Sequence, residues 1–257
     1  MLHSFGMKTI HDLKVLLMQV RLDKETLHEE RVAFAEYSGL RVEQIETLNI
    51  FETPVFEPSI LDGYDALFVG GSSDEGDALI VRDKPAFAVH SMAVLAEAYE
   101  RKMPVFASCY GFQAAVVALG GELLHDPSRA EKGTPAIHVT DAGKDDPVFR
   151  DAPSPFYAVA VHEKLAAWLP EGAITLAETE ACPHHAFCFP DRPFYAFQFH
   201  PEVDLGELER RLKRYQERYL ESDSAFDELM RGAKDTTHAQ VLLGKYMERI
   251  LLPWVNK

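Results

Sequence analysis

Short apolar segments alternate with helical segments throughout the first half of this 257-residue chain. Each apolar segment favours a buried strand, and Gly39 follows the first helical segment, where a C-cap glycine belongs. The predicted strands are residues 14–20, 41–48, 65–69 and 105–107, and the predicted helices are residues 25–38, 85–101 and 110–119. Strands and helices that alternate at this spacing predict an α/β fold with a doubly wound, mostly parallel open sheet and flanking helices.

The second half of the chain has a different pattern. Further strands are predicted at residues 135–140, 156–161, 174–178, 185–189 and 194–199, separated by Pro, Gly and Asp turns. They indicate a small antiparallel extension of the sheet. After residue 204 the apolar residues recur at helical spacing as far as Tyr219, and residues 235–252 are predicted as a last helix that Pro253 ends. We therefore expect an N-terminal extension at residues 1–13, a main domain at 14–204, and a C-terminal helical appendage at 205–257 packed on the same domain.

Composition narrows the class of protein. The formal net charge of −15 disfavours nucleic acid as a partner. Three cysteines are an odd number, which does not suggest a disulfide framework and fits a reducing compartment. No apolar stretch approaches the roughly 18–20 residues that span a bilayer, and the N-terminus lacks a signal-peptide profile. We expect a cytoplasmic protein without a membrane partner.

The segment around Cys109 has the pattern of a nucleophile on a sharp turn. Small residues, Ala107 and Gly111, lie two positions before and after the cysteine, between a predicted strand and a predicted helix. A tight strand-to-helix turn needs small residues there, as in the nucleophile elbow of serine hydrolases. The helix N-terminus favours a thiolate. An inert core thiol is the alternative interpretation of Cys109. It is the favoured interpretation for Cys182 and Cys188, which do not have small residues two positions before and after them.

A histidine and a glutamate follow at the end of the last predicted strand. His200 and Glu202 are two residues apart, so on an extended backbone their side chains point to the same side. Glu202 can then orient the imidazole while the other ring nitrogen accepts the thiol proton of Cys109. A surface His-Pro-Glu loop is the alternative, and the pair gains weight only together with the cysteine turn.

These segments resemble the class I glutamine amidotransferase domain. Cys109, Gly111 and Gln113 match the elbow of that family, and residues 198–202 match its Gln-Phe-His-Pro-Glu signature. Residues 68–72 resemble its strand that ends in Gly-Gly. The stretches at 131–133 and 146–149, and residues 161–162 followed by 169–172, are similar to the glutaminase domain of GMP synthase. The resemblance covers roughly residues 14–204 in register, and it implies a flavodoxin-like sheet.

The resemblance also implies roles for single residues. Cys109 would attack the side-chain amide of glutamine, with His200 and Glu202 as the base and its orienting group. Backbone N–H groups of Gly71 and Tyr110 would form the oxyanion hole. Ammonia would leave first, and water would then hydrolyse the glutamyl thioester.

The substrate positions implied by the family are Gly70, Gln113, Val161 and His162. The activity expected is glutamine hydrolysis to glutamate and ammonia, with the ammonia passed to a separate synthetase or acceptor protein. The sequence leaves open a γ-glutamyl hydrolase that acts on other γ-glutamyl compounds, a regulatory or binding module with a vestigial triad, and a homodimer. The Glu163-Lys164 pair stands where GMP synthase relatives often carry Gly-Asp, which argues against a specific GMP synthase role.

No metal or cofactor is predicted. Cys182, His184, His185 and Cys188 could suggest zinc, but adjacent histidines on an extended chain point in opposite directions. Their spacing also fits none of the common structural zinc patterns. A P-loop signature is missing from the sequence, and the residues after Gly70-Gly71 are acidic and unsuited to phosphate.

Overall fold

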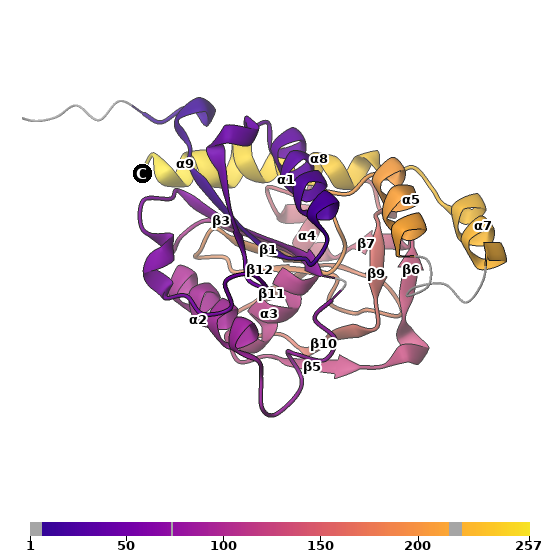
Figure 1. Ribbon diagram of the computed structural model, residues 1–257. Coiled ribbons are helices and arrows are strands. Elements are labelled where there is room, and N and C mark those ends of the chain that lie inside the picture. The colour runs from indigo at the N-terminus through magenta and orange to yellow at the C-terminus, as the bar shows by residue number, and fades with distance from the viewer. Residues whose placement is uncertain (1–6, 73, 216–222) are drawn as a thin grey trace, which may run out of the picture.

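Figure 1 shows the computed structural model, in which a central sheet lies between two groups of helices. The structure describes residues 7–72, 74–215 and 223–257. The strands are β1 (Val15–Val20), β2 (Ile45–Asn49), β3 (Ala66–Ser72), β4 (Val105–Ser108), β5 (Glu122–His125), β6 (Glu131–Gly133), β7 (Ala136–Val139), β8 (Phe156–Tyr157), β9 (Ala160–His162), β10 (Lys164–Trp168), β11 (Ile174–Glu178), β12 (Ala186–Cys188) and β13 (Phe194–Phe197). The helices are α1 (Lys24–Ser38), α2 (Ala86–Glu100), α3 (Tyr110–Ala118), α4 (Asp141–Asp145), α5 (Leu205–Arg214), α7 (Asp223–Gly232), α8 (Thr237–Tyr246) and α9 (Leu252–Val255).

The sheet combines a parallel half with an antiparallel half. Within the described residues, nine strands are joined in the order β2-β1-β3-β4-β13-β12-β11-β7-β8. The first five strands in this order run parallel, and each later strand pairs antiparallel with its neighbour. Two short ribbons, β10-β5 and β6-β9, lie beside the main sheet. The predicted doubly wound sheet with an antiparallel extension is confirmed.

The two faces of the sheet are buried by different helices. Along β1, Val15 and Leu17 pack with Phe34 of α1, while Leu16 and Met18 belong to the cluster that α2 and α3 cover. Successive side chains of a strand point to opposite faces, so a strand that is covered on both faces reads as a continuous apolar run. This is why residues 14–20 are recognisable as a central strand.

Helix α8 completes the core on the α1 face. Leu242, Leu243 and Tyr246 are fully buried there. The ring of Tyr246 lies 5.3 Å from that of Phe106 in β4, and its hydroxyl donates to the carbonyl of Pro193 at 3.1 Å. In Figure 1, α8 lies alongside α1 above the sheet. The predicted division into residues 14–204 and 205–257 stays a prediction.

Some element boundaries differ from the prediction. The strand predicted at residues 41–48 begins only at Ile45, because residues 42–44 form a 3-10 turn. The side chain of Gln44 donates to the carbonyls of Ile10 and Leu13, which holds this turn against the N-terminal segment. The strand predicted at 156–161 is interrupted and forms β8 and β9.

The surface ribbons and the C-terminus were also predicted incompletely. Strands β5, β6 and β10 were missed, since they are short and partly exposed. Pro253 does not end the last helix. It lies in the first turn of α9, directly after the π-helical stretch Met247–Leu251, and the chain stays helical to Val255. Tyr219 lies outside the described residues. None of the helices in the described part of the chain has the length and apolar character needed to cross a membrane.

Candidate active site

Cys109 lies on a strained turn between β4 and α3. Its backbone has φ 50° and ψ −101°, in a region that residues with a side chain rarely adopt. The neighbouring strand holds this turn, because the N–H of Cys109 donates to the carbonyl of Phe197 at 2.7 Å. Cys109 as a whole is 5% exposed. A strained, well-supported nucleophile at the carboxyl end of a central parallel strand is the geometry of a nucleophile elbow.

Gly111 allows this turn to pack closely against β3. A Cβ added at Gly111 would lie 2.7 Å from the carbonyl oxygen of Val69 and 2.8 Å from the Cβ of Val69. Neither the strand backbone nor its buried side chain can move away easily. The sequence requirement for a small residue after the nucleophile therefore has a direct steric cause.

We expect Gly111→Ala to destabilise the protein by about 1–3 kcal/mol, the usual cost of overpacking a well-packed interior. Urea denaturation measures this change. Gly232→Ala is the matched control, because an added Cβ there meets no atom of the described chain within 4 Å. Equal stability of the two variants would contradict the steric role of Gly111.

His200 and Glu202 form a buried pair beside the thiol. Nδ1 of His200 lies 2.7 Å from Oε1 of Glu202, and the Glu202 side chain is fully buried. The N–H of His200 donates to the carbonyl of Val159 at 2.8 Å, which fixes the backbone after β13. The hydroxyl of Ser108 also donates to Oε1 of Glu202, at 2.9 Å. The carboxylate is thus held by the residue that precedes Cys109.

The charges of the pair stabilise an imidazolium. Burial lowers the pKa of His200, but the charges of Glu202 and Cys109 and their hydrogen bonds outweigh burial and raise this pKa from its usual 6.5 to about 10. Burial raises the pKa of Glu202, and the charge of His200 more than offsets it, so this pKa lies below its usual 4.5. A Cβ added at Gly71 would approach both Cε1 of His200 and Cβ of Cys109, so the imidazole and Cys109 lie on the same side of the glycine turn.

Replacing Glu202 by glutamine is expected to make the stability of the protein less dependent on pH. In the wild type, the raised pKa of His200 contributes stability that is complete below pH 6.5 and is lost as the pH rises through about 10. The lowered pKa of Glu202 contributes stability that is lost below pH 4.5. The free energy of unfolding, measured by urea denaturation, should therefore differ most between wild type and variant from about pH 4.5 to 6.5. A difference that stays constant up to pH 10 would contradict the ion pair.

Gly70 and Gly71 make room for two different side chains. A Cβ at Gly71 would lie 2.5 Å from Cε1 of His200 and 3.3 Å from Cβ of Cys109, so its backbone lies directly against the nucleophile and the base. A Cβ at Gly70 would lie 2.6 Å from Oε1 of Glu30. Gly71 thus lies beside Cys109 and His200, while Gly70 faces a buried carboxylate.

A pocket of about 240 Å³ opens at the thiol. Its lining residues are Ser72, Glu75, Gly76, Cys109, Gln113, Lys132, Val161, His162, Glu163 and Lys164. It includes three of the four substrate positions expected from the sequence, and Gly70 is not among the lining residues. Oε1 of Gln113 is buried and finds no hydrogen-bond partner among the described residues. An amide oxygen of this kind can accept a hydrogen bond from a substrate amine or amide.

The sequence interpretation missed a buried ion pair behind the glycine turn. Nη2 of Arg21 lies 2.9 Å from Oε1 of Glu30, and both side chains are almost fully buried. Nη2 of Arg21 would lie 3.2 Å from a Cβ at Gly71. Arg21 directly follows the apolar run of β1, and a charged residue at the carboxyl end of a central strand is the signal that could have found it.

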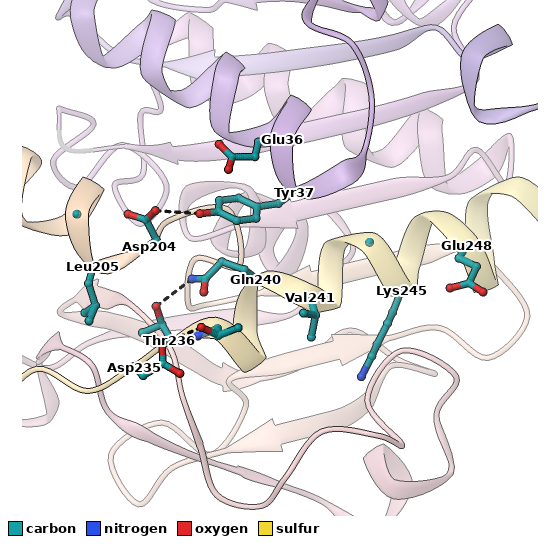
Figure 2. A pocket seen from close by; sticks show the side chains of 13 residues that line it. Glu36, Tyr37, Asp204, Leu205, Asp235, Thr236, Gln240, Val241, Lys245 and Glu248 are labelled. Carbon is teal, nitrogen blue, oxygen red and sulfur yellow. Dashed lines mark hydrogen bonds between the residues drawn. The ribbon is translucent and has the colours of Figure 1, made fainter.

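A larger groove of about 710 Å³ lies between the C-terminal end of α1 and the N-terminal ends of α5 and α8 (Figure 2). The hydroxyl of Tyr37 donates to Asp204 across it, as Figure 2 shows. Gln240 donates to the carbonyl of Val203 at 2.8 Å, and the N–H of Val203 donates to the carbonyl of His200 at 3.3 Å. One wall of this groove therefore supports the loop that carries the histidine.

Comparison with known proteins gives a consistent result. Residues 39–215 match the family model described as "Glutamine amidotransferase class-I". The glutamine-hydrolyzing GMP synthase of Lactobacillus delbrueckii subsp. bulgaricus is 36% identical over 111 residues, which are 43% of this chain and 21% of that protein. One subunit of the glutamine-hydrolyzing GMP synthase of Methanocaldococcus jannaschii is 34% identical over 106 residues, which are 41% of this chain and 54% of that protein. The match thus spans about a fifth and about half of these relatives.

The fold has solved counterparts as well. A glutamine amidotransferase from Thermotoga maritima superimposes with a TM-score of 0.73 at 17% identity, covering 94% of this chain and 99% of the other. At this identity the likeness concerns the fold alone.

Proposed function

The chain belongs to the class I glutamine amidotransferase family, and on this premise we propose that it hydrolyses the side-chain amide of glutamine to glutamate and ammonia. The observation that carries the proposal is the contact of three elements. Cys109 on its strained turn and His200 both lie against Gly71, and His200 is held by buried Glu202 at 2.7 Å. This is the arrangement of a nucleophile, a base and an orienting carboxylate.

The first half of the reaction forms a thioester. The sulfur of Cys109 attacks the amide carbon of glutamine, and His200 takes the thiol proton. The oxyanion of the tetrahedral intermediate accepts hydrogen bonds from the backbone N–H groups of Gly71 and Tyr110. His200 then passes the proton to the departing nitrogen, and ammonia leaves as the carbon–nitrogen bond breaks.

The second half restores the thiol. His200 removes a proton from water, the water oxygen attacks the thioester carbon, and the carbon–sulfur bond breaks to release glutamate while His200 returns the proton to the sulfur. Throughout, Glu202 keeps the imidazole in one orientation and stabilises its charged form. Gln113 and the backbone around Val161 and His162 bind the glutamine in the 240 Å³ pocket.

The ammonia goes to a separate acceptor protein in this proposal. The relative from Methanocaldococcus jannaschii is named as one subunit of its GMP synthase, and so as one part of an assembly. Lys164 lines the pocket and pairs with Glu75 at 3.0 Å. The Glu163-Lys164 pair, which replaces the Gly-Asp often found in GMP synthase relatives, therefore forms part of the pocket wall. The acceptor is accordingly left unassigned among ammonia-consuming synthetases.

The test compares glutamine with γ-glutamyl amines as substrates of the purified chain. We expect one glutamate and one ammonia per glutamine, with a higher kcat/KM for glutamine than for any γ-glutamyl amine. A preference for γ-glutamyl amines would instead favour a γ-glutamyl hydrolase. An electrophilic glutamine analogue should label Cys109 even where full turnover needs the acceptor. If neither turnover nor labelling occurs, the vestigial module is the correct interpretation.

A further inference from the structure

Four metal-ligating side chains meet in the interior beside the substrate pocket. They are Glu131, His162, Cys182 and His185, here called the Glu131 cluster. Taking one ligand atom from each, these atoms all lie within 4.8 Å of one another. The sequence suggested no metal site because Cys182 and His185 are only one half of this group. The other half comes from a surface ribbon twenty or more residues upstream in the chain.

The group joins one pair of strands to the turn before β12, and its side chains are mostly buried. Glu131 of β6 lies directly opposite His162 of β9 in the antiparallel ribbon, and these two labels are adjacent in Figure 1. His185 precedes β12, and its N–H donates to the carbonyl of Ala177 at 2.8 Å. The side chains of His162 and His185 are 1% and 0% exposed, and that of Glu131 is 10% exposed. Strands hold side chains more precisely than loops do, so Glu131 and His162 are the more rigidly placed half of the group.

The ring nitrogens already converge on one oxygen. Nε2 of His185 lies 2.7 Å and Nε2 of His162 lies 3.1 Å from Oε2 of Glu131. Bond lengths of about 2.0–2.3 Å to zinc put tetrahedral ligands roughly 3.3–3.8 Å apart. Zinc would therefore lengthen the two short contacts and draw the farthest pair together by about 1 Å, which side-chain rotations can supply.

A second layer of hydrogen bonds orients two of the ligands. The hydroxyl of Thr179 donates to Oε1 of Glu131 at 2.9 Å, which leaves Oε2 directed at the histidines. The same hydroxyl accepts from the N–H of Cys182 at 2.9 Å, and the N–H of Thr179 donates to the carbonyl of Cys182 at 2.9 Å. Thr179 thereby fixes both an oxygen ligand and the turn that carries the sulfur. Partners of this kind orient the ligands in known metal sites.

We propose that Glu131, His162, Cys182 and His185 bind one zinc ion. Sulfur and imidazole nitrogen are the ligands that zinc prefers, and four protein ligands make a closed structural site. Binding releases the thiol proton of Cys182. One thiolate and one carboxylate then balance the two positive charges of zinc, so the buried site is neutral overall. A metal-free cluster, in which both histidines donate to Glu131, is the competing interpretation.

The position of the cluster gives the ion a structural task. His162, one of the ligands, lines the substrate pocket. Lys132, which directly follows the ligand Glu131 in the chain, lines it as well. Zinc would tie the β6-β9 ribbon to the turn between β11 and β12 of the main sheet through these four side chains. The cluster contains none of Cys109, His200 and Glu202, so zinc binding can be measured without the glutaminase reaction.

The test measures zinc in the full chain with Cys109→Ala, so that the catalytic thiol cannot be the ligand. After stripping with a chelator and dialysis against zinc, we expect one equivalent of zinc per chain by elemental analysis. Cobalt in place of zinc should give a thiolate-to-metal charge-transfer band and tetrahedral d–d bands. Cys182→Ala and His185→Gln should each weaken zinc binding at least tenfold.

Two controls separate the metal site from general loss of structure. Glutamine at position 185 can still donate to Glu131, so His185→Gln keeps the hydrogen-bonded cluster while removing a metal ligand. Cys188→Ala removes another buried thiol outside the cluster and should leave the zinc stoichiometry unchanged. Zinc binding that is absent in the parent chain, or equal in the parent and in both cluster variants, would overturn the proposal. Circular dichroism in chelator shows whether each variant is folded.

Discussion

Cys109→Ala is expected to lower the rate of glutamine hydrolysis by a factor of about 10³ or more, because the reaction has no other nucleophile in position. Without the sulfur, the site can hold glutamine and polarise its carbonyl, but no thioester forms. Water would have to attack the amide directly. The assay follows ammonia release at saturating glutamine, and labelling by an electrophilic glutamine analogue should disappear as well.

The protein should remain folded in this experiment. Alanine at position 109 keeps the Cβ, so the backbone at φ 50° is neither relieved nor strained further. The amide of residue 109 still donates to Phe197. Cys188→Ala, which removes a buried thiol elsewhere, should retain activity within a few-fold. Ammonia release from Cys109→Ala at the wild-type rate would disprove the thioester mechanism.

Glu202→Gln is expected to lower kcat by about 10²–10⁴-fold while changing KM much less. The carboxylate lies 2.7 Å from Nδ1 of His200, so His200 carries a proton on that nitrogen and presents Nε2 to the thiol. A glutamine amide can donate to Nδ1 instead and favour the other tautomer, which cannot accept the thiol proton. The charge that stabilises the imidazolium is lost at the same time.

A neighbouring carboxylate provides the control for this prediction. Glu207 is also buried, and it pairs with Arg211 within α5 and not with the histidine. Glu207→Gln should therefore change kcat by less than about tenfold, in the range of a lost buried ion pair without a catalytic role. If the two glutamine variants lose activity equally, buried charge near the site matters and the orientation of His200 does not.

The sequence predicted the parallel half of the fold well and the antiparallel half less completely. Central strands such as residues 14–20 are buried on both faces, so their apolar runs are unmistakable. The ribbon strands β5 and β6 are short and partly exposed, and their residues carry almost no periodic signal. The turn at 42–44 depends on Gln44 reaching Ile10 and Leu13, a tertiary contact that local pattern cannot show.

The residues of the candidate site also fall into two groups, those that the local sequence predicted and those that it did not. Cys109, His200 and Glu202 were found because each lies in a local motif whose spacing already implies a geometry. The predicted oxyanion donor Gly71 and the pocket residues Gln113 and His162 came from resemblance, and their roles remain proposals. Two contacts were missed: the hydrogen bond from Ser108 to Glu202, and the ion pair of Arg21 with Glu30 behind the glycine turn. The local sequence pattern does not show which buried partner such a side chain contacts.

The sequence by itself determined the alternation of strands and helices, the sharp turn at Cys109 and the pairing of His200 with Glu202, because these depend on neighbours within a few residues. Only the tertiary structure decided which residues from distant parts of the chain contact these segments. Gly70 faces Glu30, Gly71 faces His200, and the Glu131 cluster joins two parts of the chain that the sequence keeps apart. The physical reason is that burial brings distant side chains together, and their contacts are set by sheet order and strand register and not by spacing along the chain.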